Sequence, residues 1–194
     1  MRTCNKVLRW AATCALVLAC QGQTPRSIAV GDVSVPVVVK PEFYANCVDA
    51  ATTLSGKEVA FAAIYYKFAA VPDRTNPSRR LFAVGVDEEK SYIQLPQPTW
   101  PTVTTQDEAN LARLDTALAW HERGHLAIAV ALAEEVTAAQ HPIASNADGV
   151  AQVKALFAAS NERQVAYDTL TTHGIHQSLA PEPLRGADTR FYCR

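Results

Sequence analysis

Residues 105–140 read TQDEANLARLDTALAWHERGHLAIAVALAEEVTAAQ, and this stretch decides the fold. Its apolar and histidine positions recur at spacings of three or four, which is the period of one helix face: Leu111, Leu114, Leu118, His121, His125, Ile128 and Leu132. Thr104 or Thr105 precedes Asp107 and Glu108, which is typical of a helix N-terminus with acids in its first turn. We therefore predict one long helix over the quoted stretch.

Inside this predicted helix lies the sequence His121-Glu122-Arg123-Gly124-His125. Positions i and i+4 of an α-helix are about 40° apart and one turn along the axis, so both imidazoles project from one face. A glutamate beside them can take a proton from a water, and this is the HExxH motif, whose usual metal is zinc. Both histidines are on the apolar stripe, so we expect the metal to face the core or a cleft. Gly124 is costly in a helix interior and is typical of a position that another segment approaches closely.

A catalytic zinc site needs a third protein ligand. The spacing of metzincins would put it at position 131, which is Ala131 and cannot ligate. We predict a second helix from about Val150 to Thr172, with Gly174 after it as a C-cap. Glu162 and His173 are the two candidates in this region, and on a continuous helix they would be roughly 16 Å apart. One ion cannot bind both of them, and the spacing leaves the choice open.

The two histidine motifs together resemble a family. His-Glu-x-x-His in a helix and Tyr-Asp-x-x-Thr-x-His-Gly downstream, at residues 167–174, are similar to a bacterial family of unknown function described as predicted secreted zinc-dependent proteases. Leu95-Pro96 and Trp100 match a further element of that family, and the resemblance covers residues 28–178. It implies the following roles: His121, His125 and His173 as zinc ligands, Glu122 as the general base, and Asp168 and Thr171 as supporting residues. The sequence does not decide between His173, Glu162 and Asp168 as the third ligand. Tyr167 could stabilise an oxyanion, but a tyrosine that packs two helices is the favoured interpretation.

The first twenty residues have the layout of an export signal. Arg2, Lys6 and Arg9 precede an apolar run that is too short to span a bilayer. The run ends in Val-Leu-Ala-Cys at residues 17–20, which resembles the lipobox of bacterial lipoproteins and implies that Cys20 is lipidated. Gln21 follows, and in such lipoproteins this favours the outer membrane. An ordinary signal peptide that ends near a cysteine is the alternative.

Removal of residues 1–19 would take away three basic residues and two cysteines. The rest would carry 15 basic and 19 acidic residues, a net charge of −4, which argues against a nucleic-acid binder. With Cys20 lipidated, only Cys47 and Cys193 remain, and in an oxidising compartment we expect them to form a disulfide. Two free thiols are the alternative. In the chain-entropy model such a bridge is worth roughly 4–5 kcal/mol.

The region before the long helix is rich in β-branched and aromatic residues and predicts short strands. We expect them at 28–39, 59–68, 81–86 and 92–95, with a short helix within 41–54 and a break at Pro96, Pro98 and Pro101. The expected fold is therefore α+β, a small N-terminal antiparallel sheet followed by two long helices that carry a zincin-like metal site. We divide the chain into a signal peptide (1–19), a tether (20–27) and one domain (28–194).

These observations favour a zinc metallopeptidase, lipid-anchored in the bacterial cell envelope and facing the periplasm. Its cofactor would be Zn²⁺, and its partners would be a peptide or protein substrate and the membrane that holds its N-terminal lipid. A non-catalytic envelope lipoprotein with a structural zinc site is the alternative. The sequence does not choose between peptides and other amides of the envelope as substrates.

Overall fold

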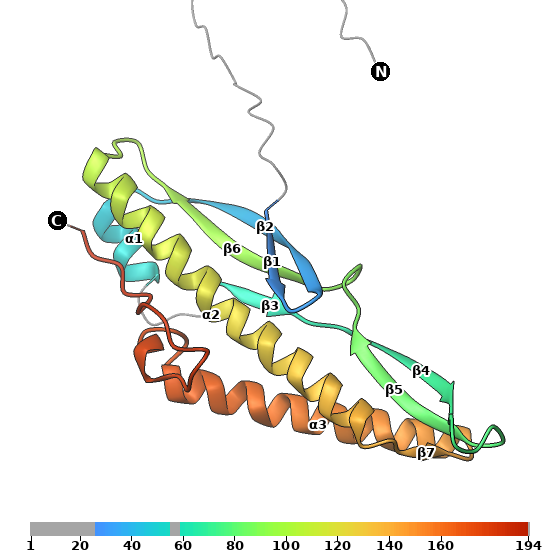
Figure 1. Cartoon of the computed structure of the whole chain (residues 1–194). Helices are drawn as coiled ribbons and strands as arrows, with labels where there is room; N and C mark the ends of the chain where they lie inside the picture. Colours follow the sequence, from blue (N-terminus) through green and yellow to red (C-terminus); the bar gives the residue numbers. More distant parts are fainter. Residues whose placement is uncertain (1–25, 55–58, 194) are drawn as a thin grey trace, which may run out of the picture.

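The computed structural model describes residues 26–54 and 59–193. The expected signal peptide and the lipidated Cys20 lie outside this part of the chain. The fold is α+β, as predicted, with short strands first and two long helices after them (Figure 1). No helix among the described residues combines the length and the hydrophobicity that crossing a membrane requires.

The first sheet is mixed, whereas an antiparallel sheet was predicted. Its order is β1-β2-β6-β3, from β1 (Ser27–Val30), β2 (Val33–Phe43), β6 (Tyr92–Thr99) and β3 (Phe61–Ala63). β1 and β2 form a hairpin in which Gly31 has a φ of +57°, as tight hairpin turns require. β2 and β6 are parallel, because α1 (Cys47–Leu54) and three strands separate them and bring the chain back to the same end of the sheet.

Pro96 and Pro98 were expected to break the chain, but β6 continues through both. β2 pairs with β6 along this whole region, opposite Lys40 and Glu42, whereas β3 pairs with β6 only as far as Gln94. Among the described residues no strand pairs with this edge of β6 beyond Gln94, and prolines are tolerated where no ladder hydrogen bond is required. β6 can therefore contain both prolines, because β3 is too short to pair with it at those positions.

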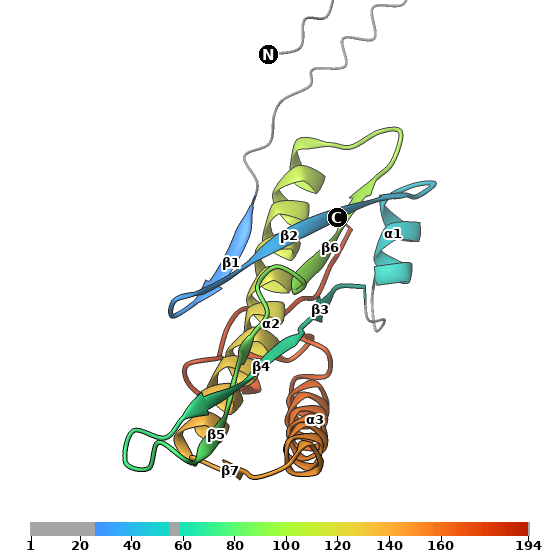
Figure 2. The same ribbon diagram turned by 90° about the vertical axis from the view of Figure 1, so that its right-hand side faces the viewer.

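A second, antiparallel sheet has the order β4-β5-β7, from β4 (Tyr66–Pro72), β5 (Arg80–Val86) and β7 (Pro142–Ile143). β4 follows β3 closely in sequence, and each of them is an edge strand of its sheet. Together they form an edge with no further strand beside it in the described chain (Figure 2).

The two long helices begin at capping boxes. α2 (Thr105–Ala138) begins at Thr104, which exchanges hydrogen bonds with Asp107 as the sequence suggests. α3 (Asn146–Thr171) begins four residues before the predicted start, since Ser145 and Asp148 form the same motif. Helix α2 contacts both sheets and α3, and its buried leucines meet those of the sheets in one core. The fully buried aliphatic residues are Val35, Ile93, Leu95, Leu126, Leu132 and Leu156.

The C-terminal tail runs from the end of α3 back along α2 to α1 (Figure 1). It begins with a short 3-10 turn, η1 (Gln177–Leu179). Trp120 Nε1 donates to the Leu184 carbonyl oxygen at 3.1 Å, and Asn110 donates to the Tyr192 carbonyl oxygen at 3.2 Å. The predicted disulfide joins Cys47 and Cys193, with an S–S distance of 2.07 Å. The bridge therefore fixes the end of the tail to the first residue of α1.

Replacing Cys193 by Ser should lower the free energy of unfolding by about 5 kcal/mol, because the bridge closes a loop across a sequence separation of 146 residues. Urea denaturation of the oxidised protein and of the variant measures the difference. Dithiothreitol should destabilise the parent protein and leave the Cys193→Ser variant unchanged. Equal stability of the two oxidised proteins would contradict the prediction.

Candidate metal centre

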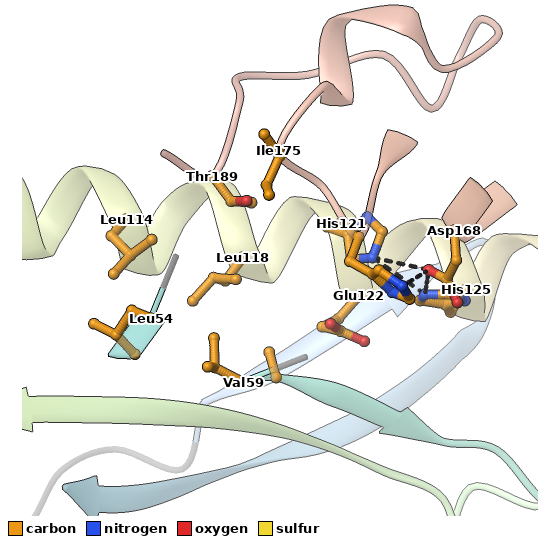
Figure 3. Close-up of a pocket in the computed structure, with 12 residues that line it drawn as sticks. Leu54, Val59, Leu114, Leu118, His121, Glu122, His125, Asp168, Ile175 and Thr189 are labelled. Carbon is orange, nitrogen blue, oxygen red and sulfur yellow. Dashed lines mark hydrogen bonds and ion pairs between the residues drawn. The ribbon is translucent and has the colours of Figure 1, made fainter. Parts of the chain in front are cut away.

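Three side chains converge where α2 faces the C-terminal part of α3 (Figure 3). His121 and His125 come from α2, and Asp168 comes from α3. The two Nε2 atoms are 3.3 Å apart, and Asp168 Oδ1 lies 3.3 Å from His121 Nε2 and 3.0 Å from His125 Nε2. Atoms bound tetrahedrally to zinc at about 2.0–2.1 Å are about 3.3–3.4 Å from one another. The three donor atoms thus have nearly the spacing of three ligands of one tetrahedral ion.

Two glutamines fix which ring nitrogens face this centre. Gln177 Oε1 lies 2.9 Å from His121 Nδ1, while the Gln177 amide nitrogen donates to Tyr167 Oη and to the Leu184 carbonyl oxygen. Gln164 Oε1 contacts His125 Nδ1, while its amide nitrogen donates to the His125 carbonyl oxygen at 3.1 Å. Because each amide nitrogen already donates to an acceptor, each Oε1 accepts a hydrogen bond from a protonated Nδ1. A neutral ring then presents the Nε2 lone pair to the centre, as metal-ligating histidines do.

The centre therefore gathers three hydrogen-bond acceptors. Asp168 Oδ1 is buried and has no hydrogen-bond donor among the described residues, although two imidazoles face it. Burial alone would raise the pKa of Asp168, but His121 and His125 hold it well below its usual range. Burial alone would lower the pKa of His125, but Asp168 and Glu122 outweigh it and raise this pKa. Such an arrangement is stable with a cation among the acceptors, either a proton on a ring or a metal ion.

The close contact of α3 with α2 depends on Gly124. A Cβ atom on Gly124 would lie 2.1 Å from Tyr167 Oη, so only glycine leaves room for this side chain. The Tyr167 ring stacks on His121 at 5.0 Å and meets His125 edge-on at 5.0 Å, and its hydroxyl donates to the His121 carbonyl oxygen. Burial raises the pKa of Tyr167 to about 12, although the hydrogen bond from Gln177 opposes this shift. Tyr167 thus packs the helices together behind the histidines, which is its favoured sequence interpretation.

His173, expected as the third ligand, is not one of the three residues whose ligand atoms lie together, which are His121, His125 and Asp168. Helix α3 ends at Thr171, and both Thr172 and His173 then adopt left-handed backbone angles. This turn leaves the His173 side chain 51% exposed, with Nδ1 at 3.7 Å from Asp168 Oδ1. Asp168, expected as a supporting residue, occupies the third position because it is still inside the helix and faces α2. Glu162, the other candidate, is exposed on α3.

Thr171 supports the end of α3. Its hydroxyl donates to the Tyr167 carbonyl oxygen at 2.8 Å and accepts from the Gly174 amide at 3.3 Å. At Gly174, with a φ of +85°, a Cβ atom would lie 3.1 Å from His121 Cγ and 2.8 Å from the Thr189 methyl carbon. The turn at 172–174 therefore passes directly against the first histidine, and glycine is required there for both its φ and its lack of a side chain.

Glu122 is almost fully buried and borders two spaces. The first is a cavity of about 20 Å³ next to the histidines, with apolar walls that include Leu114, Leu118 and Ile175 (Figure 3). The second is a groove of about 250 Å³ between β3 and α3. It is lined by Phe61, Ala62, Ile64, Ser160 and Gln164. Glu122, His125 and Asp168 line both spaces, so the centre lies where the cavity meets the groove.

Sequence reasoning missed the two glutamines. Gln164 precedes Asp168 by four residues, so helical periodicity could have placed both on one face of α3. Gln177 lies beyond the helix end, and its approach to His121 depends on the turn at 172–174, which carries no signal for such a contact. His141 lies between the helices and His176 borders η1, and neither is in the group of three donors.

A Gly124→Ala substitution should lower the free energy of unfolding by about 1–3 kcal/mol, the usual cost of overpacking, although alanine is the better helix former. Gly149→Ala is the matched control, because a Cβ atom at this position of α3 meets nothing within 4 Å. The control should be stabilised by about 0.5–1 kcal/mol. Urea denaturation measures both, and equal effects of the two substitutions would show that Tyr167 does not restrict position 124.

Comparison with known families gives one match. Residues 87–174 match the family described as "Bacterial protein of unknown function (DUF922)". No curated protein and no solved structure matches the chain. The matched segment contains His121, Glu122, His125, Asp168 and His173, but neither the strands β1–β5 nor the tail that carries Gln177. What this chain has in common with that family is therefore the part that forms the candidate metal centre.

Proposed function

We propose that this protein is a zinc-dependent peptidase of the bacterial cell envelope, held to the membrane by a lipid on Cys20. The observation that carries the proposal is the group of three acceptor atoms, His121 Nε2, His125 Nε2 and Asp168 Oδ1, beside a buried glutamate and an open groove. The match to a bacterial family fits a bacterial origin. The export signal is the sequence argument for the envelope.

The donor set suits zinc better than harder cations. Imidazole is a preferred ligand of zinc, whereas Ca²⁺ and Mg²⁺ select sites made of oxygen atoms. Two histidines and one carboxylate give a net charge of −1, and three ligands leave the fourth tetrahedral position for a water or a substrate. In our proposal Asp168, not His173, is the third ligand. A bound zinc ion would acidify that water and polarise the carbonyl group of an amide.

Glu122 is the proposed general base. Its position next to His121 on α2 directs it to the junction of the small cavity and the groove, where a water and an amide could meet. Its carboxylate takes a proton from the attacking water and passes it to the amide nitrogen. The water oxygen bonds to the carbonyl carbon as the C–N bond breaks, so the products are one carboxylic acid and one amine.

The groove explains how a peptide would reach the centre. Its one wall is β3, an edge strand, and its other wall is α3 from Ser160 to Asp168. Tyr65, between β3 and β4, accepts a hydrogen bond from the Asp87 amide at its carbonyl oxygen and donates one from its own amide to Ser91 Oγ, both on the side of β5 and β6. Since alternate residues of a strand direct their backbone groups to opposite edges, Ala62 and Ile64 present theirs to the groove. An extended peptide could pair with them by strand addition.

A structural zinc site is the second candidate function. The observation in its favour is His173, whose Nδ1 is 3.7 Å from Asp168 Oδ1. If this ring turned inward it could supply a fourth ligand and close the site, as in zinc centres that only stabilise a fold. The groove beside the centre favours the peptidase, because a substrate has to reach a catalytic zinc ion, whereas a structural zinc ion needs no such access.

Substitution of each candidate ligand tests the site. Asp168→Ala should weaken zinc binding by more than about a hundredfold, beyond the 10–100-fold typical of groups that only support a ligand. His173→Ala should change it by less than about tenfold, and Glu162→Ala, an exposed control on the same helix, should have no effect. Competition with a chelating dye and metal analysis of the purified proteins give the affinities. A larger loss from His173→Ala than from Asp168→Ala would favour the sequence-based ligand set.

Substitution of Glu122 tests the chemistry. Glu122→Gln should slow peptide hydrolysis by about 10²–10⁴-fold, since it removes the proton acceptor, and should keep the zinc stoichiometry. Hydrolysis of a broad peptide library by the zinc-loaded parent and by the variant measures this effect. Chelator treatment of the parent should abolish cleavage, and added zinc should restore it. A parent protein that retains zinc and cleaves nothing would leave the structural zinc site as the better account.

A further inference from the structure

One face of α3 extends beyond the metal centre. Asp168, Gln164 and Ser160 line the groove beside the centre, and Phe157, Val153 and Val150 continue the same face at spacings of three or four. Phe157 and Val150 are 51% and 54% exposed, although both are apolar. The helix face that supplies a ligand therefore becomes an apolar surface that begins about 16 Å from Asp168 at Phe157 and extends to about 27 Å at Val150, at 1.5 Å per residue.

Strand β4 lies opposite this apolar surface. Alternate residues of a strand share one side, and on this side Tyr66 and Phe68 contact Phe157 with ring centroids 6.0 and 6.3 Å apart. Phe68 also stacks on Phe82 of β5. A groove of about 710 Å³ lies between the sheet and α3 here, and we call it the apolar groove. Its apolar lining includes Phe68, Ala70, Phe82, Val150 and Val153, and Phe157 borders it.

The free edge of β4 indicates what would occupy the apolar groove. Among the described residues β4 pairs only with β5. Lys67 and Pro72 are near its two ends, and the residues between them, from Phe68 to Val71, carry no charge. Edge strands that are not meant to pair are commonly protected by charges, bulges or a cover. A ligand that displaces water from this exposed edge has to replace the hydrogen bonds of the backbone groups, which an extended polypeptide does and an apolar small molecule does not. The aromatic lining selects apolar side chains.

The apolar groove and the groove at the metal centre lie along the same strand edge and the same helix face. β3 and β4 follow each other along one edge (Figures 1 and 2). Asp168, Gln164, Phe157 and Val153 share one face of α3 by their spacing. The hydrogen bond of 2.9 Å between Tyr66 Oη and Ser160 Oγ connects β4 to α3 between the two grooves. A strand paired with β3 would therefore continue toward β4.

We propose that the apolar groove is a second substrate subsite, which binds an apolar side chain of an extended polypeptide about seven to eight residues from the scissile bond. Val153 and Val150 line the groove, and their distance from Asp168 of about 22–27 Å along α3 corresponds to about seven to eight residues of extended chain. The inference rests on the proposed peptidase function and adds a preference to it. The substrate class is an unfolded or extended polypeptide with an apolar residue at that distance.

Binding to the Glu122→Gln variant of the full mature chain, loaded with zinc, tests the subsite without hydrolysis. The probes are fluorescein-labelled dodecapeptides of alternating Ser and Thr, with one Phe at each position in turn or with none. Fluorescence anisotropy should show that peptides with a suitably placed Phe bind at least about tenfold more tightly than the peptide without Phe. Adding Phe157→Ser or Val150→Ser should remove this gain. Adding Phe43→Ser, an exposed aromatic residue at the end of β2, should preserve it.

Cleavage by the zinc-loaded parent separates the two proposals. Cut sites should lie about seven to eight residues from the Phe, and Phe157→Ser should scatter them. Cleavage without this preference would overturn the subsite and leave the peptidase standing. Phe-dependent binding without any cleavage would contradict the peptidase and not the groove. Equal binding with and without Phe, or a dimer that Phe157→Ser abolishes and that excludes the peptides, would overturn the inference, and the dimer would assign the groove to a second copy of the chain.

Discussion

The meeting of one carboxylate oxygen with two imidazole lone pairs is the interaction on which the rest of the structure depends. Asp168 Oδ1, His121 Nε2 and His125 Nε2 lie within 3.0–3.3 Å of one another, and all three are acceptors in the neutral protein. Removing such groups from water is unfavourable unless a positive charge joins them. The surrounding contacts keep them together. Both Nδ1 atoms are hydrogen-bonded to glutamine oxygens, so neither imidazole ring can rotate without losing its hydrogen bond.

The supports of this centre come from distant parts of the chain. Gln177 reaches His121 only because the backbone reverses at Thr172–Gly174, and Gly174 lets that turn lie against His121. The tail after Gln177 is bonded along α2 and ends at the bridge to Cys47. The disulfide, the left-handed turn and the orientation of one histidine are thus parts of one constraint. This explains how a small domain with a short tail can hold a buried polar group in a single orientation.

The sequence predicted the long helix, the HExxH pair and the disulfide, since each depends on local periodicity or on the count of available cysteines. It left the third position of this group open between His173, Glu162 and Asp168, because that position depends on where α3 ends. A helix continued to Thr172 makes His173 a plausible ligand, whereas the observed left-handed residues leave its side chain 51% exposed and leave Asp168 facing α2. Gly124 was recognised as a site of close approach, but only the packing identifies Tyr167 as its neighbour. The parallel pairing of β2 with β6 was missed for a similar reason, since strand direction depends on the path of the whole chain.

The arrangement of α3 links chemistry to recognition. The same helix face carries Asp168 and Gln164 at the centre and Phe157 and Val150 in the apolar groove, so a rotation of α3 by one residue, about 100°, would disrupt both at once. The contact of Tyr167 with Gly124 sets that rotation, because only this orientation lets the ring stack on His121. Gly124 in the HExxH helix therefore determines the position of Asp168 at the centre and the direction in which the apolar face of α3 extends from it. For a peptidase this coupling has a direct consequence: the scissile bond and the recognised side chain are measured along one rigid helix, not across a flexible loop.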